Sequence, residues 1–132
     1  MSMTAPNCYE HPECTAYHQN KFYVSYPQAH CIKVFGKTGM YIHDIGCEGS
    51  SDGQFSYARG LVIDKYNRLI VCDGSERRLQ LFTLSGKFLG TLQGEYPNNC
   101  NSPWCAASDK NGNLVVAGPF ESFIVVFDKK RD

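Results

Sequence analysis

The chain repeats itself with a period of 45 to 47 residues. The apolar pairs that close the three copies lie 47 and then 45 positions apart: Val34-Phe35, Leu81-Phe82 and Val126-Phe127. An apolar run begins at the same offset before each pair, at Phe22, Leu69 and Leu114. Self-similarity at a fixed period predicts a repeat architecture in which each copy packs against the next. The apolar residues recur because they form the packed faces, whereas the polar residues of the loops are free to vary.

Each copy contains four short apolar runs separated by turn residues, which are clearest in the middle copy. There the runs cover 61–64, 69–72, 79–82 and 87–92, and apolar and polar residues alternate with a period near two. Four short strands joined by tight turns within roughly 45 residues are typical of one blade of a β-propeller. We therefore predict an all-β fold of four-stranded antiparallel blades. The chain holds about two and three-quarter blades, a partial propeller.

The predicted domain organisation follows from these repeats. An irregular lead-in covers 1–11, and the propeller segment covers 12–132. Within that segment the three copies are assigned to 12–55, 56–101 and 102–132.

The middle copy, from Ala58 to Leu92, resembles an NHL repeat. The signature positions of that family are occupied by Asp64, Asn67, Asp73, Arg78 and the strand Leu79-Gln80-Leu81-Phe82. The preceding stretch EGSSDGQF is similar to the glycine-rich lead-in of such repeats. The whole arrangement most resembles the carboxy-terminal propellers of tripartite-motif (TRIM-NHL) proteins, a ubiquitin ligase family whose NHL propellers bind protein or RNA partners.

The resemblance implies a non-catalytic binding module. Ligase activity requires a RING with paired CxxC ligands, and no CxxC occurs in the sequence. The flanking copies keep the apolar pattern and lose the polar signature. Tyr26 and Gly118 stand at the place of Asp73, and Cys31 and Phe123 stand at the place of Arg78.

The number of blades raises the question of assembly. NHL propellers usually close with six blades, whereas this chain holds fewer than three. A blade cannot bury both faces of its sheet without neighbours. At about 25 cal/mol per Å², a bare face of several hundred Å² would cost roughly several kcal/mol. We expect the sequence to be part of a longer chain; the alternative is that two copies pair into a closed ring.

Composition limits the partners and the location. Thirteen basic and thirteen acidic residues cancel, so no net field favours nucleic acid or a membrane as an obligatory partner. No apolar run is long enough to span a bilayer, and the amino terminus lacks the pattern of a secretory signal. Seven cysteines without framework spacing indicate reduced thiols. We expect a cytoplasmic protein without a membrane partner.

The loops between the second and third strands, together with the segments that lead into each first strand, are predicted to share one rim. The predicted rim residues are Tyr26, His30, Tyr57, Arg59, Arg77, Arg78, Trp104 and Phe120. Aromatic and arginine side chains dominate many protein interfaces, and they also stack on unpaired bases. A protein partner is favoured because the charges cancel, and single-stranded RNA is the alternative. Arg78 has a competing structural role, in which it binds Asp73 or the carbonyls of neighbouring loops.

A zinc site is a weak candidate near the amino terminus. The spacing C-x2-H-x2-C-x3-H is formed by Cys8, His11, Cys14 and His18. Zinc accepts such ligands tetrahedrally. However, Cys14 to His18 overlaps the expected first strand, so incidental residues in an irregular lead-in are the favoured interpretation.

An enzyme is a distant alternative. Six-bladed propellers also include metal-dependent lactonases and lyases, in which oxygen ligands converge on the central channel. The candidates here are Asp64, Asn67 and Asp109, too few for the several oxygen ligands that calcium prefers. No G-x-S-x-G elbow and no P-loop occurs. We therefore expect no catalysis and no cofactor.

Overall fold

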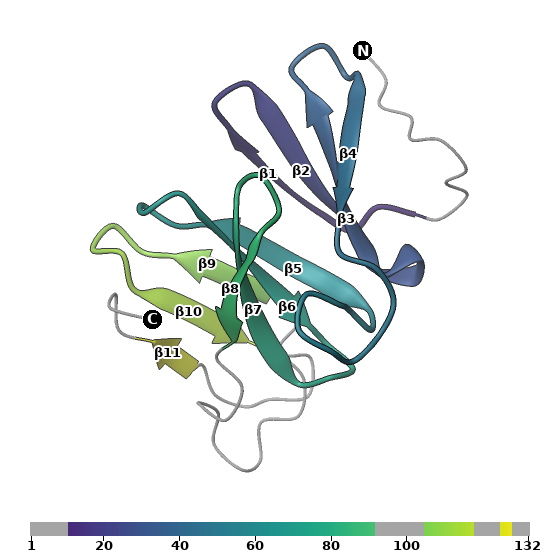
Figure 1. Ribbon diagram of the computed structural model, residues 1–132. Helices are drawn as coiled ribbons and strands as arrows, with labels where there is room; N and C mark the ends of the chain where they lie inside the picture. The colour runs from purple at the N-terminus through teal and green to yellow at the C-terminus, as the bar shows by residue number, and fades with distance from the viewer. Residues whose placement is uncertain (1–10, 92–104, 118–124, 128–132) are drawn as a thin grey trace.

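The computed structural model describes residues 11–91, 105–117 and 125–127 of the 132-residue chain (Figure 1). These residues form three antiparallel sheets. Blade 1 contains β1 (Cys14–His18), β2 (Lys21–Tyr26), β3 (Cys31–Gly36) and β4 (Tyr41–Ile45). Blade 2 contains β5 (Ala58–Ile63), β6 (Arg68–Asp73), β7 (Arg78–Thr83) and β8 (Phe88–Thr91). Blade 3 contains β9 (Cys105–Ser108), β10 (Leu114–Ala117) and β11 (Val125–Phe127).

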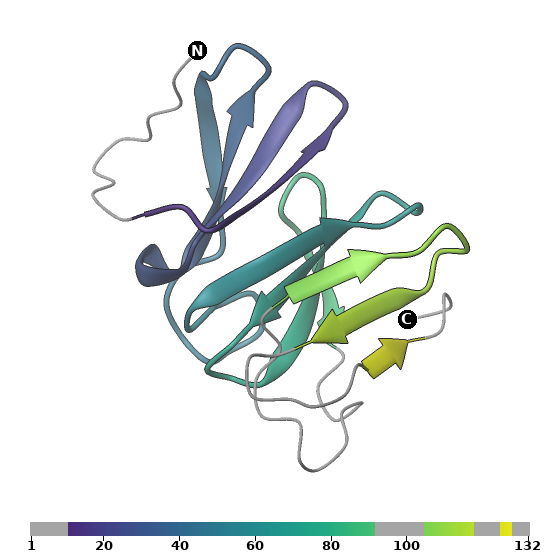
Figure 2. The ribbon, with the colours of Figure 1, turned by 180° about the vertical axis from the view of Figure 1, so that it is seen from behind.

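Within each sheet, the spatial order of the strands follows the chain. The first strands of the blades are neighbours in space, because β1 contacts β5 and β5 contacts β9. Figures 1 and 2 show β5 and β9 side by side, with the later strands of each blade fanning away from them. This arrangement confirms the predicted all-β fold of two four-stranded blades and most of a third.

The hydrophobic core lies between the blades rather than within one sheet. Alternate residues of β6 and β7 face opposite neighbours, as the period-two side-chain pattern of a strand requires. Leu69, Val71 and Phe82 pack with buried residues of blade 1 and with Phe55, which belongs to the connection between the two blades. Ile70, Cys72, Leu79 and Leu81 pack instead with Leu114 and Val116 of blade 3. The repeated apolar pattern therefore encodes the contacts between successive blades.

Five hairpin turns join β1 to β2, β3 to β4, β5 to β6, β7 to β8, and β9 to β10. They lie along the same side of the molecule (Figures 1 and 2). Asp64 organises the β5–β6 turn by accepting hydrogen bonds from the main-chain N–H groups of Tyr66 and Arg68, at 2.9 and 3.0 Å. Asp109 repeats this arrangement in the β9–β10 turn, where its Oδ1 accepts the N–H groups of Asn111 and Asn113. Hydrogen bonds from Asn113 hold the pKa of Asp109 below its ordinary value.

The strand bounds of blade 2 lie within one residue of the predicted ones, except at the start of the first strand. The first strand of blade 2 begins at Ala58 rather than at residue 61, because a register shift between Ala58 and Leu61 interrupts the alternation that sequence patterns detect. The fourth strand covers Phe88–Thr91, and residue 92 lies outside the described residues. The described helical structure is the short 3-10 helix η1 (Pro27–Ala29), so within these residues no helix could cross a membrane.

Candidate functional site

Three of the predicted rim residues, His30, Tyr57 and Arg59, lie together where blade 1 meets blade 2. The main-chain N–H of Tyr57 donates a hydrogen bond to Nδ1 of His30 at 3.0 Å. The two rings meet edge to face, with centroids 5.1 Å apart. The guanidinium carbon of Arg59 lies 5.7 Å from the centroid of the Tyr57 ring. These three residues, together with Glu13, are called the Tyr57 cluster below.

The backbone of Tyr57 is held in a left-handed conformation, with φ +64°. This region costs a non-glycine residue about 1–2 kcal/mol, so neighbouring contacts must impose it. The β6–β7 turn supplies two of those contacts. The N–H of Gly74 donates to the carbonyl of Tyr57 at 3.2 Å, and the N–H of Ser75 donates to the carbonyl of Ser56 at 3.1 Å. The side chain of Tyr57 nevertheless stays 39% exposed, which makes it a rigidly presented surface ring.

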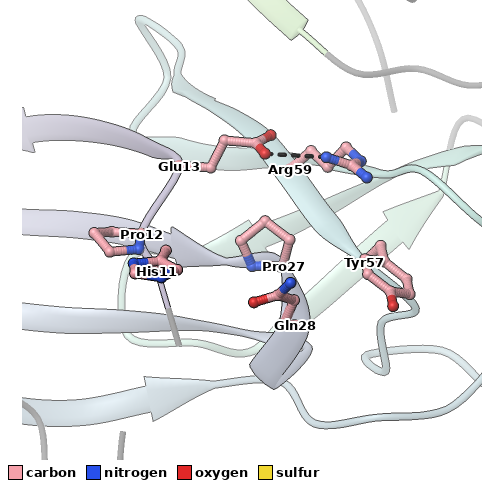
Figure 3. A pocket seen from close by; sticks show the side chains of 7 residues that line it. All are labelled: His11, Pro12, Glu13, Pro27, Gln28, Tyr57 and Arg59. Carbon is pink, nitrogen blue, oxygen red and sulfur yellow. Dashed lines mark hydrogen bonds and ion pairs between the residues drawn. The ribbon is translucent and has the colours of Figure 1, made fainter. Parts of the chain in front are cut away.

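A shallow pocket of about 180 Å³ opens beside the cluster (Figure 3). It is lined by His11, Pro12, Glu13, Pro27, Gln28, Tyr57 and Arg59. Nη1 of Arg59 donates to Oε1 of Glu13 at 3.0 Å, and both side chains are partly exposed. Figure 3 places this ion pair on one side of the pocket, with His11 and Pro12 toward one end and Tyr57 toward the other. The pocket therefore offers an aromatic ring, proline surfaces and a solvent-accessible charge pair.

The ring of His30 has a defined orientation. Because Nδ1 accepts the Tyr57 N–H, Nδ1 carries no proton, and the proton of the neutral ring lies on Nε2. Nε2 lies 3.7 Å from Oε2 of Glu48, whose side chain is 77% exposed. His30 itself has a left-handed backbone, with φ +55°, directly after η1. His30 therefore supports Tyr57 from the neighbouring blade.

Arg78 has the structural role rather than a place on the exposed rim. Its Nε donates to Oδ2 of the fully buried Asp73 at 2.9 Å. Its Nη2 donates to the carbonyls of Ser51 and Gln54, at 3.0 and 2.9 Å. Burial raises the pKa of the Asp73 carboxyl, which Arg78 and the N–H of Ser56 counteract. This network ties the connection between blades 1 and 2 to the sheet of blade 2.

The remaining predicted rim residues divide into three groups. Tyr26 is buried, 6% exposed, because it packs with Val24 and Phe35 in a cluster on the sheet of blade 1; its prediction as an exposed rim residue is wrong. Arg77 is exposed in the β6–β7 turn, beside the segment that supports Tyr57. Trp104 and Phe120 lie outside the described residues.

The predicted zinc ligands are only partly within the described residues, because Cys8 lies outside them. Cys14 and His18 are in β1, as the overlap with the first strand predicts, and the thiol of Cys14 approaches the carbonyl of Leu61 at 3.9 Å. Across 11–91, 105–117 and 125–127, no three His, Cys, Asp or Glu side chains are grouped to hold a metal ion.

The enzyme candidates Asp64 and Asp109 occupy turns after β5 and β9 rather than the starts of those inner strands. Each carboxylate accepts hydrogen bonds from its own turn. The position of these aspartates therefore differs from the converging arrangement that a propeller metal site would need.

Sequence reasoning did not select Glu13, Pro27 or Gln28 as site residues. Pro27 and Gln28 belong to the loop between the second and third strands of blade 1, which the sequence predicts to lie on the rim, but neither is aromatic or charged. Glu13 directly precedes the first strand, and the repeat gives no signal for it, because its partner Arg59 is 46 positions away. Only the packing of blade 1 on blade 2 brings these residues to Tyr57.

Comparison with known proteins places this arrangement in a family. Residues 9–114 match the model of DUF5128, described as a 6-bladed beta-propeller. The chain belongs to this propeller family. No curated protein matches the sequence.

Solved structures share the propeller fold at low sequence identity. A candidate exported protein from Bacteroides fragilis superposes with a TM-score of 0.77 at 18% identity, over 98% of this chain and 38% of its own. The WD40 beta propeller domain of Doa1 has a TM-score of 0.71 at 15% identity, over 96% and 39%. Virginiamycin B lyase from Staphylococcus aureus has a TM-score of 0.67 at 15% identity, over 95% and 43%. This propeller chain therefore spans less than half the length of each of these proteins.

Proposed function

We propose that this propeller segment is a non-catalytic binding module, a protein-interaction scaffold that contacts its partner through the Tyr57 cluster. The observation that carries the proposal is the exposed ring of Tyr57 on a left-handed backbone that contacts from two blades impose. Tyrosine and arginine are enriched among residues that dominate protein interfaces. A ring that is already ordered loses little conformational entropy on binding, which favours affinity.

The adjoining pocket supports a peptide-like partner. Its volume of about 180 Å³ suits one inserted side chain rather than a drug-sized ligand. The Glu13–Arg59 pair offers both a hydrogen-bond acceptor and donors at its edge. We infer that a protruding side chain of the partner enters the pocket while its backbone crosses Tyr57.

The charge around the cluster favours protein over single-stranded RNA. Glu13 belongs to the cluster, Glu48 lies 3.7 Å from His30, and the described residues at this end of the molecule include more acidic than basic side chains. These acidic side chains would repel a phosphate backbone, which contributes most of the affinity in sequence-independent RNA binding.

The NHL-like signature of blade 2, including Asp73 and Arg78, supports a finer assignment to the tripartite-motif type of propeller, in which the module would select proteins for a ubiquitin ligase.

Substitution of Tyr57 tests the proposal. Tyr57→Gly removes the ring while glycine retains the left-handed backbone, so the fold is kept. A protein recovered by affinity capture with the wild-type chain should bind this variant with a loss of about 2 kcal/mol or more, measured by calorimetry. Arg59→Ala should weaken the same complex.

The matched control is Leu89→Ala, which truncates a similarly exposed side chain on β8, away from the cluster. It should leave the affinity unchanged. Equal affinities of wild type and Tyr57→Gly for every captured protein would contradict the proposal. A captured single-stranded RNA whose affinity depended on Arg59 and Tyr57 would replace it with the RNA alternative.

A further inference from the structure

The five hairpin turns place positive charge at one end of the molecule, although the chain as a whole is neutral. This end, called the hairpin end, consists of those turns with the strand residues that border them (Figure 1). Its basic residues come from every turn: Lys21, Lys37, Lys65, Arg68, Lys87 and Lys110. Its acidic residues are Asp64 and Asp109. Six cations and two anions give the hairpin end a net charge of +4.

The opposite end of the described molecule has the reverse balance. Its acidic residues are Glu13, Glu48, Asp52, Asp73 and Glu76, and its basic residues are Arg59, Arg77 and Arg78. Five anions and three cations give a net charge of −2. The neutrality of the chain therefore conceals a separation of charge along the direction of the strands.

The lysines of the hairpin end face solvent, whereas Arg68 and the two carboxylates form local hydrogen bonds. All five lysines are exposed. Asp64 is 3% exposed and accepts Nε of Arg68 at 2.9 Å as well as two main-chain N–H groups. Asp109 accepts the side-chain amide of Asn113 at 3.0 Å. The lysine ammonium groups therefore dominate the field outside this end.

Three large side chains stand among these lysines. Tyr17 is 56% exposed, Tyr66 is 49% exposed and Met40 is 68% exposed. Tyr17 lies close to the β1–β2 turn, Met40 ends the β3–β4 turn and Tyr66 is in the β5–β6 turn. Tyrosine has an apolar body with a polar tip, which suits the boundary between water and lipid.

We propose that the hairpin end docks on the surface of an anionic lipid bilayer. Lysines spread over several turns match a diffuse layer of anionic headgroups, and Tyr17, Tyr66 and Met40 would enter the interface between headgroups. Binding is peripheral and electrostatic, so it requires no membrane-spanning helix. The sequence-based expectation of no membrane partner rested on the net charge of the whole chain and did not consider this separation of charge.

The side chains favour lipid over single-stranded nucleic acid. Stacking of a base requires a free aromatic face. The Tyr66 ring already has two cations near it, with Nζ of Lys65 at 5.4 Å and the guanidinium carbon of Arg68 at 5.2 Å from its centroid. Five of the six cations are lysines, which act as point charges, whereas planar recognition of phosphates and bases favours arginine. Met40 has no role in base stacking but fits an interface with lipid.

Vesicle co-sedimentation of the full chain tests the inference. The probe is vesicles with about 30% phosphatidylserine in phosphatidylcholine, compared with phosphatidylcholine alone. The chain should bind only the anionic vesicles, and binding should weaken as the salt concentration rises. The double variant Lys37→Gln with Lys110→Gln should bind roughly 25-fold more weakly, since each cation near such a surface contributes about fivefold.

A charge-balanced variant separates the effect of the lysines at the hairpin end from the effect of the net charge of the chain. Adding Asp52→Asn and Glu76→Gln, both at the opposite end, returns the double variant to the wild-type net charge. Its binding should stay as weak as that of the double variant, with circular dichroism confirming that both remain folded. Recovery of vesicle binding in the balanced variant would overturn the inference. The inference would also be overturned if the chain failed to bind the anionic vesicles. This holds whether or not the chain captures a single-stranded oligouridylate through Lys37 and Lys110.

Discussion

Arg77 and Arg78 are adjacent in the sequence but occupy opposite environments. Arg78 begins β7, where the alternation of the strand directs it toward the connection between the blades, and it is 5% exposed. Arg77 precedes the strand with φ +57° and is exposed. Because Asp73 is completely buried, its carboxylate depends on Arg78 for charge compensation. Arg78 thus stabilises the fold, whereas the neighbouring Arg77 is exposed on the surface.

Replacing Arg78 by alanine should lower the free energy of unfolding by about 3–5 kcal/mol, because it leaves an uncompensated buried carboxylate. Urea denaturation at neutral pH measures the change. Arg77→Ala is the matched control and should change stability by no more than about 0.5 kcal/mol. Similar effects of the two substitutions would contradict the structural role of Arg78.

The difference in stability between the wild type and Arg78→Ala should depend on pH, because the pKa of Asp73 is raised. A carboxyl whose folded pKa lies above its unfolded value is penalised when ionised, and the penalty is relieved as pH falls through the folded pKa. Without Arg78 the pKa should rise further. The stability gap between wild type and Arg78→Ala should therefore narrow as the pH is lowered from neutral toward mildly acidic values.

The connections between blades are as constrained as the strands. Gly46 follows β4 and adopts φ +83°, where the chain turns toward blade 2. A Cβ added to Gly46 would overlap Cε2 and Cδ2 of Phe55, a completely buried ring between the blades. Phe55 in turn lies 5.5 Å, centroid to centroid, from Phe82. The connection therefore takes part in the core instead of simply linking two sheets.

Gly46→Ala should destabilise the chain by more than about 2 kcal/mol, because it combines a left-handed backbone with overpacking against Phe55. Gly90→Ala in β8 provides the control. A Cβ at Gly90 would meet no atom within 4 Å, so this change should be neutral or stabilising by up to about 1 kcal/mol. Thermal unfolding of both variants checks the contrast, and an equally stable Gly46→Ala chain would refute the packing described for the connection.

At the scale of the whole molecule, each blade covers one face of the next. In β10, Leu114 and Val116 are buried against blade 2, whereas the alternating residues Val115 and Ala117 are only partly buried. This chain spans 38% of the length of the Bacteroides fragilis propeller, and its family closes with six blades. We expect the partly buried face that carries Val115 to pack against a further blade or a second copy of the chain.

Produced alone, the chain should self-associate with increasing concentration, because pairing covers such a face. Sedimentation velocity over a range of concentrations measures this association. Val115→Lys places a charge on the face and should shift the equilibrium toward monomer without removing a fully buried side chain. A monodisperse monomer at every concentration would show that the face needs no neighbour.

The repeat was sufficient to predict the strands and their order. Leu69 to Cys72 and Leu79 to Phe82 are short alternating segments between turn residues, and local pattern determines such strands. Asp64 was predicted to end the first strand and lies instead in the turn directly after it, where its partners Tyr66 and Arg68 are only two and four positions away. What depends on near neighbours in the chain is visible in the sequence.

The candidate site was only partly visible, because its contacts join residues far apart in the chain. Tyr57 and Arg59 were selected by residue type, but their partners His30 and Glu13 are 27 and 46 positions away. Residue type also suggested an exposed Tyr26, which the sheet of blade 1 buries. The sequence by itself determined the repeated blade and its alternating faces, since these depend on local periodicity. Only the stacking of one blade on the next decided which polar residues meet, which are buried, and which end of the molecule carries the positive charge.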